Sequence, residues 1–210
     1  MYSPTIQKLI DLFAALPAIG PKSASRIVFY LLKRPQAEID EFLNSFGQMK
    51  KAVKICVFCQ NPFEPKKGNE VLCQICSDPQ RDKSLLCLVE KEADLEILEK
   101  TKKYQGFYFV LGGLLSPLRK KEAEKTIIEN LLKRLKKPSQ FGLAKADFKE
   151  IILAISYTTE GIATSLYLER ALKPLGLKIT RLGLGLPLGA EIEYADEETI
   201  SSAIESRKEL

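Results

Sequence analysis

Four of the five cysteines stand in two closely spaced pairs, and this pattern constrains the fold more than any other feature of the chain. Cys56 and Cys59 form the first pair and Cys73 and Cys76 the second, which gives the spacing C-x2-C-x13-C-x2-C. Two such pairs can each present two thiolates to one tetrahedral metal ion, and the proline and glycine between them are typical of a hairpin or loop. The spacing predicts a four-cysteine zinc finger over residues 55–78.

The expected metal is one structural Zn²⁺ ion per chain, because four protein ligands leave no open coordination position for a water. Redox chemistry at a single pair and an iron–sulfur cluster are the less favoured alternatives. So short a segment holds little apolar core of its own, so we expect chelation of the metal to unfold it. The fifth cysteine, Cys87, lies in an apolar run and is interpreted as a small buried apolar residue.

The 210-residue chain contains no histidine, which excludes Ser-His and Cys-His catalytic pairs and every His-ligated metal. One or two domains are expected at this length, and 45% hydrophobic with 28% charged residues is typical of a globular protein. No run of 18 apolar residues is present, and residues 1–8 lack the basic start and apolar stretch of a signal peptide. These features predict a cytoplasmic protein without membrane contact, where paired cysteines favour metal over disulfides.

The net charge of +5 hides two basic stretches and an acidic tail. Residues 1–55 carry eight Lys or Arg against four Asp or Glu, residues 101–137 carry ten against three, and residues 185–210 carry two against seven. Basic residues concentrated in this way fit contact with a polyanion. The alternative is that a run such as 133–137 is only the solvent-exposed face of a helix.

Two kinds of periodicity divide the chain. Helical spacing of apolar residues predicts helices over 6–16, from Pro21 through Leu32, and over 39–53. Beyond them, short apolar runs alternate with amphipathic stretches, which predicts an α/β region with a mostly parallel sheet covered by helices. The predicted strands are 85–89, 107–111, 151–155 and 177–182, and the helices are 93–102, 120–135 and 162–172. Residues 183–195 are expected to form a loop with a short strand, followed by a helix over 197–207.

The segment Leu16 to Ala24, LPAIGPKSA, is typical of a helix-hairpin-helix motif. A glycine-bearing turn at the start of a helix leaves backbone N–H groups available to a phosphate. Lys22 and Arg26 lie one helical turn apart and would add positive charge there. Phosphate contacts carry no sequence information, so the motif predicts sequence-nonspecific DNA binding.

Taken together, these motifs resemble the RecR family of bacterial recombination-repair proteins, and the resemblance runs from the hairpin to near the C-terminus. It is carried by the hairpin with Lys22-Ser23-Ala24, the four paired cysteines, and several stretches further along the chain. These stretches are Leu88-Val89-Glu90, Tyr108 to Leu118 (YFVLGGLLSPL), Glu160-Gly161 with Ala163-Thr164, Gly185-Leu186-Pro187, and Glu193 to Asp196. The chain departs from the family pattern at Ala18, where glycine is usual, so the turn loses some freedom to adopt positive φ.

The resemblance implies a domain order and a function. It implies a helix-hairpin-helix domain over 1–54, the zinc finger over 55–78, a Toprim domain with a mostly parallel four-stranded sheet over 84–180, and a C-terminal segment over 181–210 that helps to build a homo-oligomeric ring, a dimer or a tetramer. Such proteins act on DNA with RecO and RecF to load recombinase at gaps. No catalytic activity is attributed to them.

Toprim enzymes hold Mg²⁺ with a Glu after the first strand and an Asp-x-Asp pair after a later one, because Mg²⁺ prefers hard oxygen ligands. Glu90 matches the first position, but Ser156-Tyr157-Thr158 stands at the pair and Ile162 at a further acidic position. Only Glu90 and Glu160 remain as plausible Mg²⁺ ligands. Equally, Glu90 would cap the following helix and Glu160 would occupy the first turn of its own helix, where negative charge is favourable.

Three functions follow from these features. The leading hypothesis is a DNA-binding accessory protein of recombinational repair that is not an enzyme. The second is a Mg²⁺-dependent Toprim nuclease or strand-passing enzyme centred on Glu90 and Glu160. The third is a zinc-stabilised module that contacts only protein.

Overall fold

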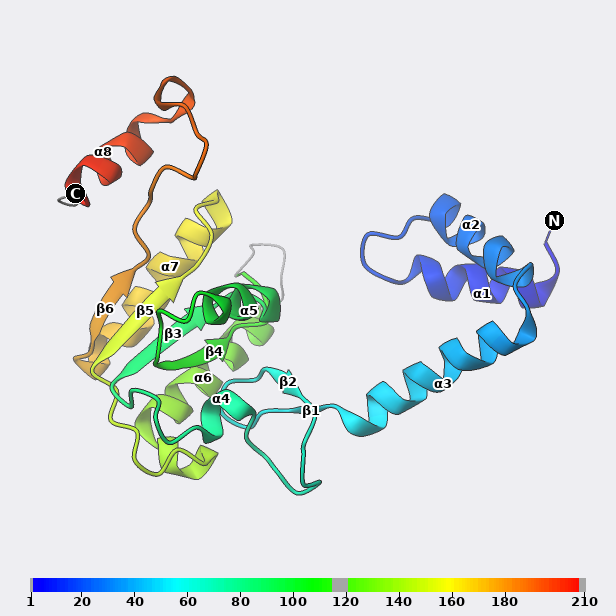
Figure 1. Ribbon diagram of the computed structural model, residues 1–210, viewed down its shortest axis with the longest axis horizontal. Helices are drawn as coiled ribbons and strands as arrows, with labels where there is room; N and C mark the ends of the chain where they lie inside the picture. The colour runs from blue at the N-terminus through cyan, green and yellow to red at the C-terminus, as the bar shows by residue number, and fades with distance from the viewer. Residues whose placement is uncertain (1, 115–120, 208–210) are drawn as a thin grey trace. The chain divides into compact units, whose positions relative to one another are not determined.

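The computed structural model (Figure 1) describes residues 2–114 and 121–207, with residues 121–125 described by their backbone alone. The chain divides into two compact units, Met1–Val53 and Lys54–Leu210. The predicted motif over 108–118 and the start of the predicted helix at residue 120 lie partly outside the described residues.

The N-terminal unit consists of three helices, as the apolar spacing predicts: α1 (Pro4–Ala14), α2 (Pro21–Leu32) and α3 (Gln36–Ala52). Proline occupies the first turn of α1 and of α2, where its missing N–H has no helical partner to lose. The buried core of the unit is small and holds Ile10 from α1 with Ala24 and Val28 from α2.

The second unit begins with the cysteine-bearing segment. Its elements are short: β1 (Lys54–Ile55) pairs antiparallel with β2 (Pro62–Phe63), and α4 (Gln74–Ser77) follows. This hairpin carries the first cysteine pair in its turn. The stretch between the two pairs, expected to be a hairpin or loop, contains no strand over residues 64–72 and is a loop there.

A four-stranded sheet with all strands parallel is the centre of the second unit. Its strands are β3 (Leu85–Val89), β4 (Phe107–Val110), β5 (Glu150–Ala154) and β6 (Lys178–Arg181). Their spatial order is β4-β3-β5-β6, so β4 and β6 are the edges. Each strand falls on a predicted apolar run. β3 and β4 are apolar or aromatic throughout, as expected of strands covered on both faces, whereas the edge strand β6 carries Lys178 and Arg181.

Helices cover both faces of this sheet (Figure 1). Alternate residues of β3 point to opposite sides: Leu86 and Leu88 join a cluster with α6 (Lys121–Lys136) and α7 (Thr159–Leu172). Cys87 and Val89 join a second cluster, to which α5 (Glu92–Lys100) contributes Leu95. The fold is α/β with a parallel sheet, as the sequence predicts.

Short helical turns and a C-terminal helix complete the unit. They are the 3-10 helices η1 (Pro138–Phe141), η2 (Lys173–Leu175) and η3 (Ile192–Tyr194), and α8 (Glu197–Glu205), which is capped by the Asp196 side chain. Residues 183–195 contain no strand, so the short strand predicted there is wrong. In the described part of the chain, no residue after Ile179 belongs to a hydrophobic cluster.

Candidate metal centre and nucleic-acid interface

The two cysteine pairs meet in one place. The sulfur atoms of Cys56, Cys59, Cys73 and Cys76 lie within 4.8 Å of one another, and all four residues are buried. A tetrahedral ion bound at the usual Zn–S distance of about 2.3 Å requires sulfur atoms roughly 3.8 Å apart, so the arrangement fits a metal. Among the described residues this is the only such group of three or more Cys, Asp or Glu side chains.

The local backbone brings the first pair into position. The Cys56 N–H donates to the Asn61 carbonyl at 3.0 Å and the Gln60 N–H to the Cys56 carbonyl at 3.1 Å, which closes a tight turn. Gln60 adopts φ of 67° at that turn. From the second pair, the Cys73 N–H donates to Cys56 Sγ at 3.4 Å. These backbone contacts bring the sulfur atoms of the two pairs together.

The four thiols also influence one another's ionisation. Hydrogen bonds from the other three thiols lower the pKa of the Cys56 thiol, whereas the same contacts and burial raise the pKa of the Cys76 thiol. Binding of a divalent cation at these four thiols would release their protons, because cysteine binds metal as the thiolate.

The cysteine-bearing segment shares its core with the sheet. Phe58, between the cysteines of the first pair, is fully buried, and its ring lies 5.9 Å from Phe148 and 6.1 Å from Phe107. The Cys59 carbonyl accepts a hydrogen bond from the Val110 N–H of β4 at 2.9 Å. The cysteine cluster is therefore part of the core that this segment shares with the sheet.

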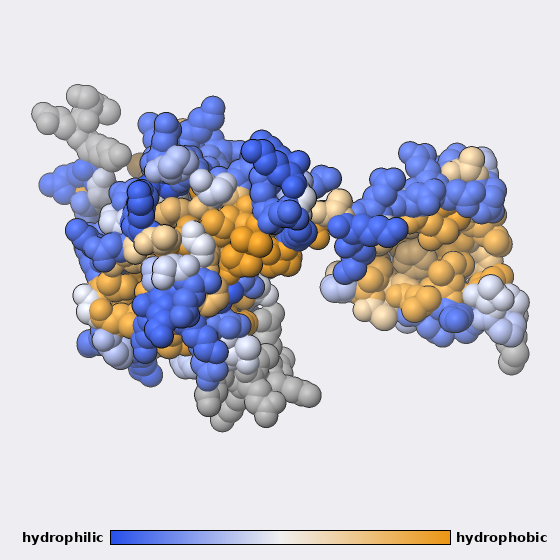
Figure 2. All heavy atoms as spheres, turned by 90° about the horizontal axis from the view of Figure 1, so that it is seen from below, coloured by the Kyte–Doolittle hydropathy of each residue, from blue (hydrophilic) through white to orange (hydrophobic). Residues whose placement is uncertain are grey.

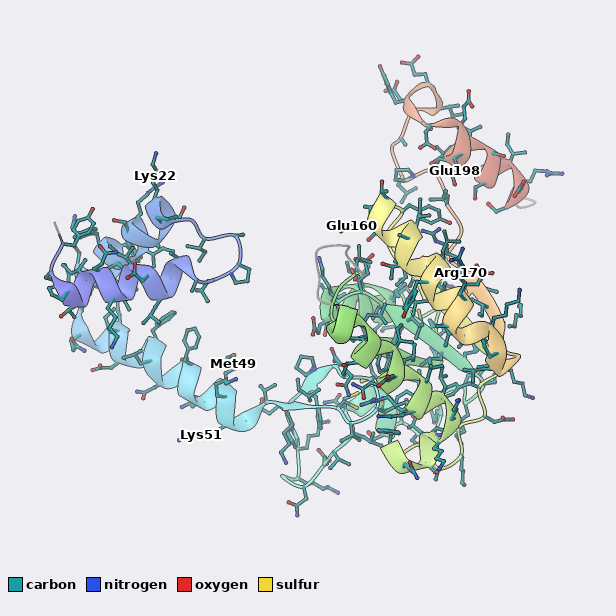
Figure 3. The ribbon with its side chains drawn as sticks, turned by 180° about the vertical axis from the view of Figure 1, so that it is seen from behind. Lys22, Met49, Lys51, Glu160, Arg170 and Glu198 are labelled. Carbon is teal, nitrogen blue, oxygen red and sulfur yellow. The ribbon has the colours of Figure 1, made fainter. Side chains whose placement is uncertain are left out.

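The hairpin between α1 and α2 presents the predicted basic residues to solvent. Lys22 and Arg26 are exposed, and both line a shallow hollow of about 490 Å³. Lys22 projects away from the helix pair (Figure 3). Gly20 is the N-cap of α2, and a Cβ placed there would meet no atom within 4 Å, so the helix start is open to a ligand.

The turn before α2 needs the conformation that Ala18 was expected to disfavour. Ala18 adopts φ of 60°, in the left-handed region where a Cβ costs roughly 1–2 kcal/mol. Alanine in place of the usual glycine therefore strains the backbone of the turn, and the hairpin still forms.

At the carboxyl edge of the sheet, Glu90 is bound to protein. It is 5% exposed, and its Oε1 accepts a hydrogen bond from the Ser156 N–H at 2.5 Å. The interpretation of Glu90 as a helix cap is wrong: the N-cap of α5 is Lys91, whose N–H donates to Asp94 at 3.0 Å. The Glu90 carboxylate turns to the loop after β5, because the Ser156 N–H there has no strand partner to bond.

The segment at the expected Asp-x-Asp positions starts a helix. The Thr158 hydroxyl accepts from the Gly161 N–H at 3.1 Å and caps α7, and Glu160 lies exposed in the first turn, as expected. Gly161 is required there, since a Cβ would lie 2.0 Å from the Ser156 carbonyl oxygen. The Glu160-Gly161 pair thus has a structural explanation.

An arginine and an aromatic ring fill the rest of this edge. The Arg181 guanidinium lies 3.5 Å from the centroid of the Tyr157 ring and donates to the Ser156 carbonyl at 3.4 Å. The Tyr157 hydroxyl in turn donates to the Leu182 carbonyl at 3.2 Å. Where a catalytic Toprim site would hold carboxylates and a metal, the described residues place a cation on a ring.

Sequence reasoning missed three buried or half-buried arginines that organise the second unit. Arg134 lies inside the run 133–137, which was interpreted as a solvent-exposed face, yet it is 7% exposed. The signal was available, since position 134 follows Leu131 by three residues and Ile127 by seven, which places it on their face of the helix. Arg81, which pairs with Glu99, and Arg181, which contacts the Tyr157 ring, carried no comparable pattern.

Comparison with known proteins places each part of the chain. A sequence model of the Toprim domain matches residues 84–183, one described as RecR, helix-hairpin-helix matches residues 6–49, and one described as RecR, C-terminal matches residues 185–208. No helix in the described part of the chain combines the length and apolar character needed to cross a membrane.

Relatives match over the whole length. The chain is 44% identical over 209 residues to the recombination protein RecR of Bifidobacterium animalis subsp. lactis, with 100% of this chain and 98% of the relative covered. It is 40% identical to the RecR of Thermobifida fusca, with 100% and 99% covered, and 41% identical to that of Rippkaea orientalis, with 100% of both covered. These relatives are named as recombination proteins, and their names carry no enzymatic activity.

Fold, cysteine cluster and matches together define a recombination protein that joins a helix-hairpin-helix to a Toprim domain. The chain belongs to the RecR family.

Proposed function

We propose that this chain is a DNA-binding accessory protein of recombinational repair that works without catalysis of its own. The observation that carries the proposal is the exposed pair Lys22 and Arg26 beside the open start of α2. Two cations one helical turn apart, with free backbone N–H groups next to them, suit the phosphates of DNA and not its bases. The family resemblance extends the proposal to joint action with RecO and RecF in loading recombinase at gaps, in the cytoplasm.

The assignment as a non-enzyme rests on the carboxyl edge of the sheet. The Glu90 carboxylate is engaged by the Ser156 N–H, and Thr158 serves as a helix cap. A nicking assay on supercoiled DNA with Mg²⁺ tests this. We expect no cleavage above background, and cleavage that disappears in Glu90→Gln would establish the nuclease or strand-passing alternative instead.

We propose that the metal is Zn²⁺ in a structural role. Four buried thiolates suit this ion, and with all four coordination positions taken it has no room for a reactive water. Elemental analysis of the purified chain is expected to find one zinc per chain and no iron.

DNA binding is tested by a salt titration. Replacing Lys22 and Arg26 together by Ala is expected to lower the slope of log K against log salt by about 2, because each lost phosphate contact releases roughly 0.9 fewer counterions. Lys8→Ala with Lys33→Ala, both exposed in the same unit, removes equal charge and serves as the matched control. Equal slopes for the two double variants would reject the hairpin as the DNA site. Wild-type protein that binds no DNA at low salt would instead favour a module that contacts only protein.

Self-association into a ring, as a dimer or a tetramer, belongs to the same proposal. The 17-residue helix α3 buries none of its residues, and Phe42, Leu43, Phe46 and Met49 are 45–61% exposed. Phe42 and Leu43 line one hollow of the N-terminal unit together with Leu9 and Leu32. Figure 2 shows an apolar area on this unit. Beyond the sheet, Leu188, Ile192 and Tyr194 are at least 70% exposed. Apolar surface of this extent is typical of interfaces.

Light scattering measures the resulting mass. We expect a multiple of the 23.6 kDa chain mass, and a lower multiple when Leu43→Asp and Phe46→Asp are combined. A monomer at micromolar concentration would contradict the ring.

We also propose that these tasks are divided among four parts of the chain. Residues 1–54 would bind DNA through the hairpin and residues 55–78 would bind the metal. Residues 84–180 would form the scaffold and residues 181–210 would take part in assembly.

A further inference from the structure

Arg134 reaches from α6 to the first cysteine pair. Its Nε donates to the Val57 carbonyl at 3.1 Å and to the Phe58 carbonyl at 2.9 Å, the two residues that separate Cys56 from Cys59. Its Nη1 donates to the Asn130 carbonyl of its own helix at 2.9 Å. One side chain thus ties the turn that bears two metal ligands to a helix 76 residues further along the chain.

Two aromatic rings also contact the Arg134 guanidinium. It lies 4.4 Å from the centroid of the Phe141 ring and 5.6 Å from that of Phe109. Contacts of a cation with aromatic rings at a buried site suit the guanidinium of Arg better than the strongly hydrated ammonium of Lys. Since Arg134 is 7% exposed, its rotamer is held by packing on several sides.

A buried cation needs compensating negative charge, or its burial costs several kcal/mol. Burial lowers the pKa of the Arg134 guanidinium, and the nearby sulfur atoms of Cys56 and Cys59 oppose that shift. A Zn²⁺ ion bound by four thiolates carries a formal charge of about −2, so the metal-bound state supplies such compensation. The charges of the metal site and of Arg134 are therefore complementary.

The backbone contact has a directional consequence. The C=O and N–H groups of a trans peptide point in opposite directions, and none of the described peptide bonds is cis. With the Val57 and Phe58 carbonyls turned to Arg134, the N–H groups of Phe58 and Cys59 face away from it. The orientation of the turn that carries both sulfur ligands is thus set from outside the cysteine-bearing segment.

We propose that Arg134 is a positioning residue of the metal centre: it holds the turn of the first cysteine pair and offsets the charge of the metal-bound thiolates. Retention of the metal then depends on α6, and by linkage the bound metal stabilises the docking of α6. This inference rests on the proposed zinc site and extends it beyond its four ligands.

The first measurement is the rate at which zinc-loaded full-length protein releases its metal to excess chelator, followed with a chromogenic zinc dye. Arg134→Met keeps the length of the side chain but loses charge and donors, and we expect release to accelerate about ten- to a hundredfold. Arg134→Lys keeps the charge but not the planar fork, so an intermediate rate is expected, which is partial rescue. Arg170→Met, on the exposed face of α7 (Figure 3), is the matched control and should release zinc at the wild-type rate.

A second measurement separates positioning of the metal from simple packing. Thermal unfolding is recorded for wild type and variant with zinc bound and after chelation. If Arg134 acts through the metal, its replacement lowers Tm more in the zinc-bound protein than in the chelated protein. Equal losses in Tm together with an unchanged release rate would overturn the proposal.

The remaining outcomes separate the role of Arg134 from the zinc assignment itself. Should Arg134→Met fail to fold, Arg134→Lys carries the test, and it must release zinc faster than wild type for the proposal to stand. Wild-type protein that contains no zinc would reject the metal assignment and this inference together. Zinc present with equal release rates in all variants would reject the role of Arg134 alone.

Discussion

The cysteine-bearing segment and the hairpin are both small, but they are built in opposite ways. The first buries all four thiols and Phe58 in a core that it shares with the sheet. The second has a core of three buried residues and exposes Lys22 and Arg26. Substitution of a buried residue in the shared core should therefore destabilise the protein. Substitution of the exposed cations should have little effect on folding.

Removal of a metal ligand should have the largest effect on stability. Cys59→Ser in zinc-loaded protein is expected to lower the free energy of unfolding by more than about 4 kcal/mol, because loss of a metal is among the few causes of changes that large. Cys87→Ala, which removes a buried thiol outside the cluster, is the control and should cost about 1 kcal/mol with zinc content unchanged. Chemical denaturation with metal analysis measures both. Equal losses would mean that the cluster holds no metal.

The shared core should be almost as sensitive. Phe58→Ala is expected to cost about 3–5 kcal/mol, since a large buried ring is lost from between Phe107 and Phe148. Val71→Ala, at an exposed site in the same segment, should change stability by less than about 0.5 kcal/mol. If Phe58→Ala melted only the cysteine-bearing segment and left the sheet transition unchanged, the two would not form one cooperative unit.

The smallest effect is expected in the hairpin. Ala18→Gly relieves the positive φ of the turn at the cost of a more flexible unfolded chain, so a net gain of about 0.5–1 kcal/mol in the N-terminal unit is expected. Ala37→Gly, within α3, should instead destabilise by about 1 kcal/mol. A higher Tm for Ala18→Gly and a lower Tm for Ala37→Gly in thermal melts would verify that the turn is strained. A loss of stability in both variants would count against it.

Much of the fold could be predicted because its signals are local. The run Leu85 to Val89 is a strand with those same bounds, since a strand buried on both faces is apolar throughout. The cysteine spacing likewise identified the cluster. By contrast, the segment over 183–195 was predicted to hold a strand from its apolar residues, yet those residues are exposed and have no neighbouring strand to pair with.

The contacts that could not be predicted join distant parts of the sequence. Nothing near Phe58 indicates that its ring packs on Phe107 and Phe148, and nothing near Arg134 indicates the carbonyl groups it bonds. The Glu90 carboxylate was expected to bind Mg²⁺ or to cap the adjacent helix, whereas it accepts a hydrogen bond from the Ser156 N–H in the loop after β5. Each of these depends on how the sheet closes, which local periodicity does not encode.

The hydrogen bond from the Val110 N–H to the Cys59 carbonyl bears on solubility as well as folding. Val110 belongs to an edge strand, and exposed edges of sheets are templates for pairing with other molecules. The cysteine-bearing segment bonds to that edge at Val110, while the opposite edge, β6, carries Lys178 and Arg181, whose charge discourages pairing. Metal-free protein is therefore expected to aggregate through β4, so that the cluster guards the cell against an insoluble form of its own repair protein.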